Sequence, residues 1–221
     1  MQYKKAILSA VLILGSGLSV IHAQTVSDID GNVYKTLTIG TQTWMAENLK
    51  TTKYRNGDKI GTTSPATKDI RNEISPQYQW AYDGKENNAD TYGRLYTWYT
   101  VTDSRGVCPI GWHVPTDAEW STLTTFLGGE IVAYGKLKET GETHWIKYDT
   151  GSNETFFTAL PGGLRNGSGT FVDIGSRGNW WSSAEYGTSD AWYRLMDYNF
   201  SSVYRYLLLK RNGISVRCIK N

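Results

Sequence analysis

The chain has 221 residues, with 23 Lys and Arg against 21 Asp and Glu, and Lys4 and Lys5 account for the whole excess of positive charge. Because the charges balance beyond residue 23, there is no basic stripe for nucleic acid and no net attraction to an anionic membrane surface. Nine Trp, and 23 Gly against five Pro, are typical of a loop-rich folded chain and not of a disordered one.

The first 23 residues have the pattern of a secretory signal peptide. Lys4 and Lys5 give a positive start, residues 6–20 are apolar, and Ala23 offers a small residue at the cleavage point. A single anchoring helix is the alternative, but the apolar run is shorter than the roughly 20 residues that a membrane span needs. We expect an exported protein (periplasm, outer surface or extracellular), with residues 24–221 as one domain and no integral membrane segment after cleavage.

The first part of the mature chain alternates strand and turn signals. Residues 26–49 are predicted to form a β-meander with turns at Asp30-Gly31 and Gly40-Thr41. Residues 55–91 are polar and rich in turn residues, whereas residues 92–99 fit either a strand or a short helix.

The clearest helix begins at Thr116. Thr116-Asp-Ala-Glu119 is a capping box, in which Thr116 and Glu119 satisfy each other's unpaired amide groups. Gly128 predicts the end of this helix, and residues 130–138 have a weaker helical pattern. The inward-facing stripe of the helix that begins at Thr116 consists of Trp120, Leu123 and Leu127.

Strand signals dominate after residue 155. Strands are predicted at 156–160, 170–174, 179–183 and 191–196. A last hairpin is predicted from residues 204–210 and 214–219, joined by a turn at Asn212-Gly213. One or two helices packed on antiparallel sheet make an α+β fold.

Several blocks of sequence resemble one family, the Fibrobacter succinogenes major paralogous domain, in the same order along essentially the whole mature chain. They are Asp30-Gly-Asn-Val-Tyr-Lys35, Trp44-Met-Ala-Glu-Asn-Leu49, Tyr92-Gly-Arg-Leu-Tyr-Thr-Trp-Tyr99, Cys108-Pro-Ile-Gly-Trp-His-Val-Pro-Thr-Asp-Ala-Glu-Trp120, Thr158-Ala-Leu-Pro-Gly-Gly163, Trp180-Trp-Ser-Ser183 and Ser215-Val-Arg-Cys218. The resemblance implies an exported protein with a loop-rich C-type lectin-like fold, distantly similar to formylglycine-generating enzymes.

The two cysteines, Cys108 and Cys218, are expected to form one disulfide in an exported protein. The bridge would close a loop of roughly 100 residues and stabilise the fold by about 4 kcal/mol. Two buried free thiols are the alternative. The resemblance supports the bridge, because in the C-type lectin-like fold a Cys before the first helix pairs with a Cys on the final strand.

We expect no metal and no other cofactor. Calcium, which C-type lectins bind, has no supporting motif, because the Glu-Pro-Asn or Gln-Pro-Asp and the Trp-Asn-Asp triplets of those lectins are absent here. Asp28-Ile-Asp30-Gly31 is interpreted as a turn and not as a calcium loop. His113 and His144 lack the spacing of zinc ligands and are interpreted as structural.

The sequence shows no catalytic constellation. Formylglycine generation needs a free thiol of low pKa, which a bridged Cys218 cannot supply, and Asn166-Gly-Ser-Gly169 does not match the nucleophile elbow of serine hydrolases. Paired carboxylates meet in space and not in sequence, so a hydrolase stays open as an alternative. Its candidate residues are Glu185, Asp190 and Asp197.

Aromatic residues indicate a binding site. A sugar-stacking platform with polar neighbours is predicted from Arg165, Asn166, Trp180, Trp181, Glu185 and Trp192. Core packing is the alternative for each Trp, since adjacent strand residues point to opposite faces. We expect a secreted or cell-surface, non-catalytic module that binds carbohydrate or another envelope component. The alternatives are an extracellular polysaccharide hydrolase that uses loop carboxylates and a purely structural envelope protein, which a large exposed apolar patch would favour.

Overall fold

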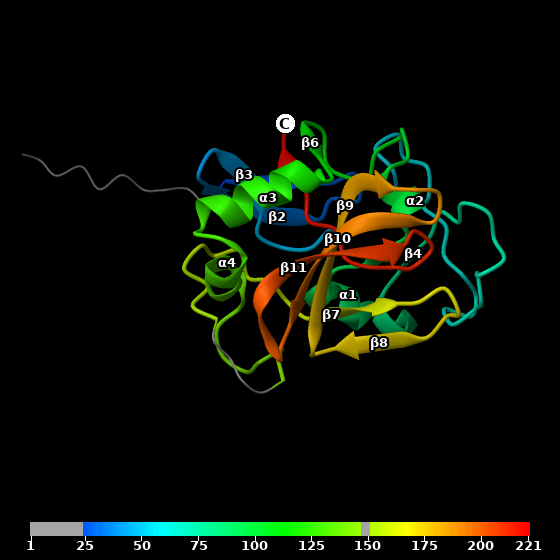
Figure 1. Cartoon of the computed structure of the whole chain (residues 1–221). Coiled ribbons are helices and arrows are strands. Elements are labelled where there is room, and N and C mark those ends of the chain that lie inside the picture. Colours follow the sequence, from blue (N-terminus) through cyan, green and yellow to red (C-terminus); the bar gives the residue numbers. More distant parts are fainter. Residues whose placement is uncertain (1–23, 147–150) are drawn as a thin grey trace, which may run out of the picture.

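The computed structural model describes residues 24–146 and 151–221, and its fold is α+β, as the sequence predicts (Figure 1). The sheets are antiparallel, and in Figure 1 two helices lie beside the two larger sheets. The predicted signal peptide lies outside the described residues. Within those two described ranges, no helix has the length and apolar character to cross a membrane.

The predicted meander is confirmed as β1 (Thr25–Ser27), β2 (Val33–Ile39) and β3 (Gln42–Met45). Asp28 builds the first turn, because its carboxylate accepts hydrogen bonds from the Asp30 amide and the Tyr34 hydroxyl. Gly40 in the second turn has a φ of 60°, the left-handed region that such turns favour. The segment that resembled a calcium loop is therefore a turn held by its own backbone.

The polar stretch after β3 contains three short elements: β4 (Gln79–Trp80), η1 (Tyr82–Gly84) and α1 (Glu86–Tyr92). Asn87-Asn88, a turn signal in the sequence, lies inside α1, and Gly93 ends this helix with a φ of 77°. The ambiguous residues 92–99 contribute to both kinds of structure. They form β5 (Leu95–Tyr96), which pairs with β4, and the start of α2 (Trp98–Val101).

The two predicted helices are confirmed as α3 (Asp117–Phe126) and α4 (Glu130–Leu137). The Thr116 hydroxyl accepts a hydrogen bond from the Glu119 amide, and the Glu119 carboxylate accepts one from the Thr116 amide at 2.7 Å. The capping box therefore determines where α3 begins. The buried stripe of the helix is the predicted set, Trp120, Leu123 and Leu127.

The second half forms two sheets from β7 (Gly162–Arg165), β8 (Phe171–Ile174), β9 (Arg177–Tyr186), β10 (Asp190–Asp197) and β11 (Phe200–Leu209). Strands β7 and β8 pair with each other, and the other three lie in the order β11-β10-β9. The strand predicted at 156–160 is wrong. Phe156 and Thr158 have φ values of 58° and 51°, which an extended strand cannot contain.

The predicted C-terminal hairpin is also wrong. Strand β11 pairs with β10, and after the turn at Asn212-Gly213 the chain enters the interior. It ends as β12 (Ile219–Lys220), which lies between β3 and β6 (Trp112–His113) in the five-stranded order β1-β2-β3-β12-β6. A hairpin pattern specifies alternation and turn but not the partner, and burial of Ile214 and Val216 in the core decided the partner here.

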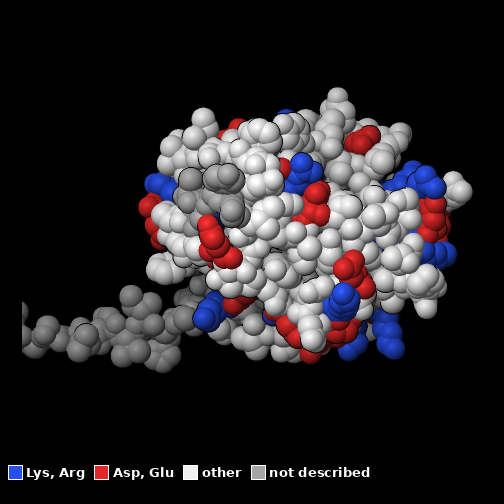
Figure 2. All heavy atoms as spheres, turned by 90° about the horizontal axis from the view of Figure 1, so that it is seen from below, with Lys and Arg blue, Asp and Glu red and all other residues white. Residues whose placement is uncertain are grey.

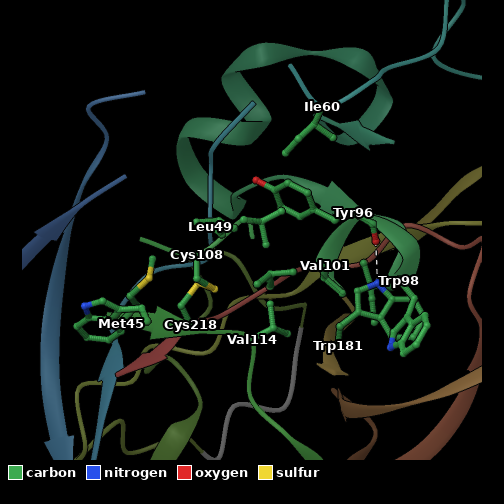
Figure 3. Packing of buried hydrophobic residues seen from close by; sticks show 14 of the residues in the cluster. Met45, Leu49, Ile60, Tyr96, Trp98, Val101, Cys108, Val114, Trp181 and Cys218 are labelled. Atoms are coloured by element: carbon green, nitrogen blue, oxygen red, sulfur yellow. Dashed lines mark hydrogen bonds between the residues drawn. A yellow bond between two sulfur atoms is a disulfide. The ribbon is translucent and has the colours of Figure 1, made fainter. Parts of the chain in front are cut away.

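The disulfide between Cys108 and Cys218 is present, with 5.9 Å between the two Cα atoms. Figure 3 shows it packed among Met45, Leu49 and Val114 in one of two buried apolar clusters. The bridge joins the segment that leads into α3 to the residue before β12. It therefore connects the middle of the chain to its C-terminal end inside the core.

Replacing both cysteines by serine should lower the free energy of unfolding by about 4 to 5 kcal/mol, because the bridge spans 110 residues and restricts the unfolded chain. Chemical denaturation of the oxidised protein and of the double variant measures this difference. Intact mass before and after reduction is the control for the bridge. Equal midpoints for the two proteins would contradict the assignment.

A second constraint on the fold is the Asp30 carboxylate. It accepts hydrogen bonds from the Thr52 amide at 2.6 Å and the Thr52 hydroxyl at 2.9 Å, and it pairs with Lys53 at 2.9 Å. Burial alone would raise the pKa of Asp30, but these partners outweigh it and lower that pKa to about 2. Asp30 thus joins the first turn to the segment after β3.

Because the folded-state pKa of Asp30 is depressed, its stabilisation is complete above the unfolded value of 3.8 and is lost as pH falls through about 2. Asp30→Asn should lower the free energy of unfolding at pH 7 by about 1 to 2 kcal/mol. The difference in the free energy of unfolding between this variant and the wild type should disappear as pH falls below 3.8. Urea denaturation across this pH range measures this difference, and Asp69→Asn, which changes an exposed carboxylate, is the control. A difference that does not change with pH would contradict the role of the Asp30 charge.

Candidate functional site

Two of the residues predicted to bind ligand, Trp180 and Trp181, are core residues. They are 1% and 0% exposed, and their indole N–H groups donate to Asn48 Oδ1 and to the Tyr96 carbonyl. Both faces of β9 are covered at this point, so each of the two adjacent rings belongs to one of the two apolar clusters. The prediction of a surface platform here is wrong, because burial takes both rings away from ligand.

Arg165 and Asn166 are structural as well. The Arg165 guanidinium is fully buried, lies 4.1 Å from the centre of the Trp80 ring and donates to the carbonyls of Ala66 and Lys68. Burial lowers its pKa to about 10. The Asn166 side chain accepts hydrogen bonds from the Ser168 hydroxyl and from the Thr170 amide within its own turn. Arg165 therefore presents no polar group to a ligand, and the amide oxygen of Asn166 is engaged within its own turn.

The remaining predicted residues, Glu185 and Trp192, do not join the others in one site. Glu185 is exposed and forms an ion pair with the buried Lys210. Trp192 is half-buried beneath the Arg205 guanidinium, which lies 3.2 Å from its ring centre. One face of this ring is therefore already occupied.

The candidate carboxylates of a hydrolase do not form one constellation of three. Glu185 and Asp190 lie on paired strands at neighbouring register positions, and Glu185 is paired with Lys210. Asp190 and Asp197 are the two ends of β10, roughly 23 Å apart at the usual rise of a strand. Asp197 is buried and pairs with Arg177 at 2.6 Å.

The histidines are held by neighbouring side chains. His113 lies between Glu119 and Asn221, and His144 lies 2.8 Å from Glu139. In the part of the chain that the structure describes, no three His, Cys, Asp or Glu side chains cluster as they would around a metal ion.

The concave surface lies elsewhere, over β2. A first cavity of about 510 Å³ has Leu37 and Ala46 on one side and Phe156 and Leu160 on the other. Its polar lining consists of Lys35, Thr36, Glu47, Asn48, Thr91, Thr158 and Arg217. The volume is within the range of small-molecule sites.

A second cavity of about 630 Å³ lies next to the first, since Leu37 and Phe156 line both. It lies between the end of β2, the C-terminal end of α3 and Lys136 of α4. A Cβ at Gly40 would lie 2.9 Å from the Phe126 ring, so this glycine allows the ring to rest on the turn. We call the two joined cavities the β2 groove.

Arg217 positions the wall of the β2 groove. It is fully buried, and its guanidinium donates to the carbonyls of Ala46, Phe157 and Thr158 and twice to Asn48 Oδ1. These contacts use all five of its N–H groups. Within the described residues no carboxylate lies within ion-pair distance of it, and burial lowers its pKa to about 9, with Glu47 acting in the opposite direction. Arg217 is therefore still a cation at neutral pH, and it holds a loop instead of binding ligand.

The loop that Arg217 holds has unusual backbone geometry. Asn153, Phe156 and Thr158 have φ values of 48°, 58° and 51°, although none is glycine. Such residues cost energy and persist where their surroundings fix them, which is common at functional sites. Phe156 is nevertheless 74% exposed, so the loop presents a large apolar ring to solvent beside the groove.

The β2 groove has no clear signature in the sequence. Phe156-Phe157 resembles a strand, and no pattern tells which ring of such a pair is exposed. Arg217 was visible in the block Ser215-Val-Arg-Cys218, but its role depends on carbonyls that lie far away in sequence. The threonines that line the groove are visible in the sequence, but polar, threonine-rich stretches are also common in ordinary loops.

Comparison with known proteins identifies the family. The sequence model of the Fibrobacter succinogenes major domain matches residues 37–220, and the chain belongs to that family. The match includes Leu37–Ile39 of β2, the loop at 153–158 and Arg217, so most of the β2 groove lies within it, but Lys35 and Thr36 of the first cavity precede it. No curated protein and no solved structure matches the chain.

Arg217→Met should lower the free energy of unfolding by about 3 kcal/mol, because it leaves buried carbonyl and amide oxygens without donors. Arg217→Lys should rescue only part of this loss, since an ammonium group cannot replace a five-donor fork. Thermal and urea denaturation measure both variants. Arg205→Met, which removes a half-exposed guanidinium paired with Asp117, is the control and should cost less than about 1 kcal/mol. Equal losses at the two positions would contradict the central role of Arg217.

Proposed function

We propose that this member of the Fibrobacter succinogenes major domain family is an exported, non-catalytic binding module that holds a carbohydrate, or another envelope component, in the β2 groove. The observation that carries the proposal is the groove itself, where two exposed phenylalanine rings lie beside hydroxyl-bearing side chains. Concave surfaces with an apolar lining and a few polar groups are the usual form of ligand sites.

Composition and surface charge support carbohydrate over a polyanion. Lys4 and Lys5 supply the net positive charge of the chain. On the face seen in Figure 2, basic and acidic side chains lie next to one another and do not gather into a patch of one sign. A nucleic-acid site would need such a patch.

The carboxylates of the groove support binding without catalysis. Glu154 in the second cavity pairs with Lys136 at 3.0 Å, and Glu47 in the first accepts the Lys35 amide at 2.9 Å. A glycoside hydrolase needs one carboxyl group free to act as acid and a second placed opposite it. Both groove carboxylates have structural partners, so the hydrolase is the weaker proposal.

We further infer a C-type lectin-like fold and an extracellular or periplasmic location. The disulfide that joins the segment before α3 to the residue before β12 supports the fold, as does the placement of both β1 and β12 in one sheet. A disulfide closing a loop of this length is typical of an oxidising compartment, which supports export.

A structural role in the cell envelope is the second candidate, favoured by one observation. Apolar side chains at the junction of α3 and α4 are exposed beside the groove: Phe126 by 63%, Ile131 by 73% and Val132 by 46%. Exposed apolar side chains that lie together often mark a protein interface. Ile131 does not line the groove, so its substitution separates this role from ligand binding.

The purified mature chain should bind specific members of a polysaccharide and glycan array, and EDTA should leave this binding unchanged. Ala46→Gln, which places a longer neutral side chain in the first cavity, should weaken binding about tenfold by excluding ligand. Ala184→Gln on β9, an equally half-exposed alanine outside the groove, is the matched control. If the wild-type protein binds no glycan on the array, this result would contradict carbohydrate binding and favour the structural role.

A further inference from the structure

The two cavities of the β2 groove meet at one aromatic side chain. Phe156 and Leu37 line both cavities, and the Phe156 ring is the more exposed of the two. Phe126 lines the second cavity only. Two exposed rings thus line two adjacent cavities, and each cavity alone has the volume of a small-ligand site.

We propose that the β2 groove binds an unbranched neutral polysaccharide, with sugar units in both cavities and the Phe156 ring stacked on the chain where they join. This inference rests on the proposed carbohydrate function and adds the charge and shape of the ligand. Aromatic faces suit the apolar faces of sugar rings. Thr36, Thr38 and Thr91 line the groove. The Thr36 hydroxyl donates to the Gln24 carbonyl and the Thr38 hydroxyl bonds that of Thr43, but a hydroxyl oxygen has two acceptor positions, so these groups can still accept from sugar hydroxyls.

The charges of the groove favour an uncharged ligand. Lys136 and Glu154 neutralise each other in the second cavity, and Lys35 and Glu47 bring opposite charges to the first. Arg217, the remaining cation, directs every N–H at protein oxygen atoms. A polymer of uronic acids needs charge-assisted donors, which Arg217 cannot supply here.

The backbone that carries the Phe156 ring is fixed before any ligand arrives. The Asn153 side chain accepts the Thr158 amide at 2.8 Å and donates to the Thr158 hydroxyl at 3.0 Å, closing the loop around Phe156. The Phe156 amide donates to the Asn153 carbonyl at 2.8 Å. A loop held in this way loses little backbone freedom on binding, which strengthens a weak stacking contact.

Isothermal titration calorimetry with neutral cello- and xylo-oligosaccharides, from disaccharide to hexasaccharide, and with oligogalacturonides tests the proposal. Affinity for at least one neutral series should rise with chain length, should exceed that for the acidic series and should not depend on salt. Phe156→Ala should weaken binding of the longest ligand about tenfold. This variant keeps the Cβ and so leaves the backbone of the loop unchanged.

Phe200→Ala on β11, which removes another exposed phenylalanine outside the groove, is the matched control and should bind as wild type does. Preference for oligogalacturonides, affinity independent of chain length, or an unchanged Phe156→Ala variant would each overturn this inference while carbohydrate binding itself still held. Binding of none of these oligosaccharides overturns it too, and the glycan array then decides whether carbohydrate binding fails with it.

Discussion

The structure depends on a buried C-terminal segment, residues 212–219, which contacts every sheet of the fold. Gly213 exchanges backbone hydrogen bonds with Arg165 of β7, and Ile214 does the same with Tyr96 of β5. Ser215 and Val216 pair with β9 and with Leu49, and Ile219 lies between β3 and β6. A segment buried on all sides must satisfy each backbone group with protein partners, so its path determines where the four sheets meet.

Two side chains make this segment a structural hub. Cys218 covalently joins it to the chain before α3, and Arg217 extends from it to the carbonyls of the groove loop. A planar guanidinium has five N–H donors in a fixed fork, whereas an ammonium group has three. The desolvation cost of burying this cation is offset by five hydrogen bonds and by the Phe157 ring, 4.2 Å away. The core and the candidate site are therefore built from neighbouring residues.

Many of the aromatic side chains of the chain pack in the interior. Trp98, Trp180 and Trp181 are buried, and each of their indole N–H groups has an acceptor inside the fold. The rings that remain available beside a cavity are phenylalanines, Phe126 and Phe156, which have no polar atom to satisfy. Exposure, and not aromatic type, separates the rings that we propose to bind ligand from the rings of the core.

Local signals determined the meander, the capped helix α3, its weaker neighbour α4 and the strands β8 to β10, because turn chemistry, capping and apolar period act within a few residues. The two cysteines and the family blocks pointed to one bridge. Tertiary structure alone decided the path of residues 214–219 through the core, the backbone at Phe156 and the burial of Arg165. These depend on contacts between residues far apart in sequence, as Arg217 with Asn48 illustrates. The β2 groove belongs to this second class, since its walls come from β2, α1, α3 and the 153–160 loop, and only folding brings them together.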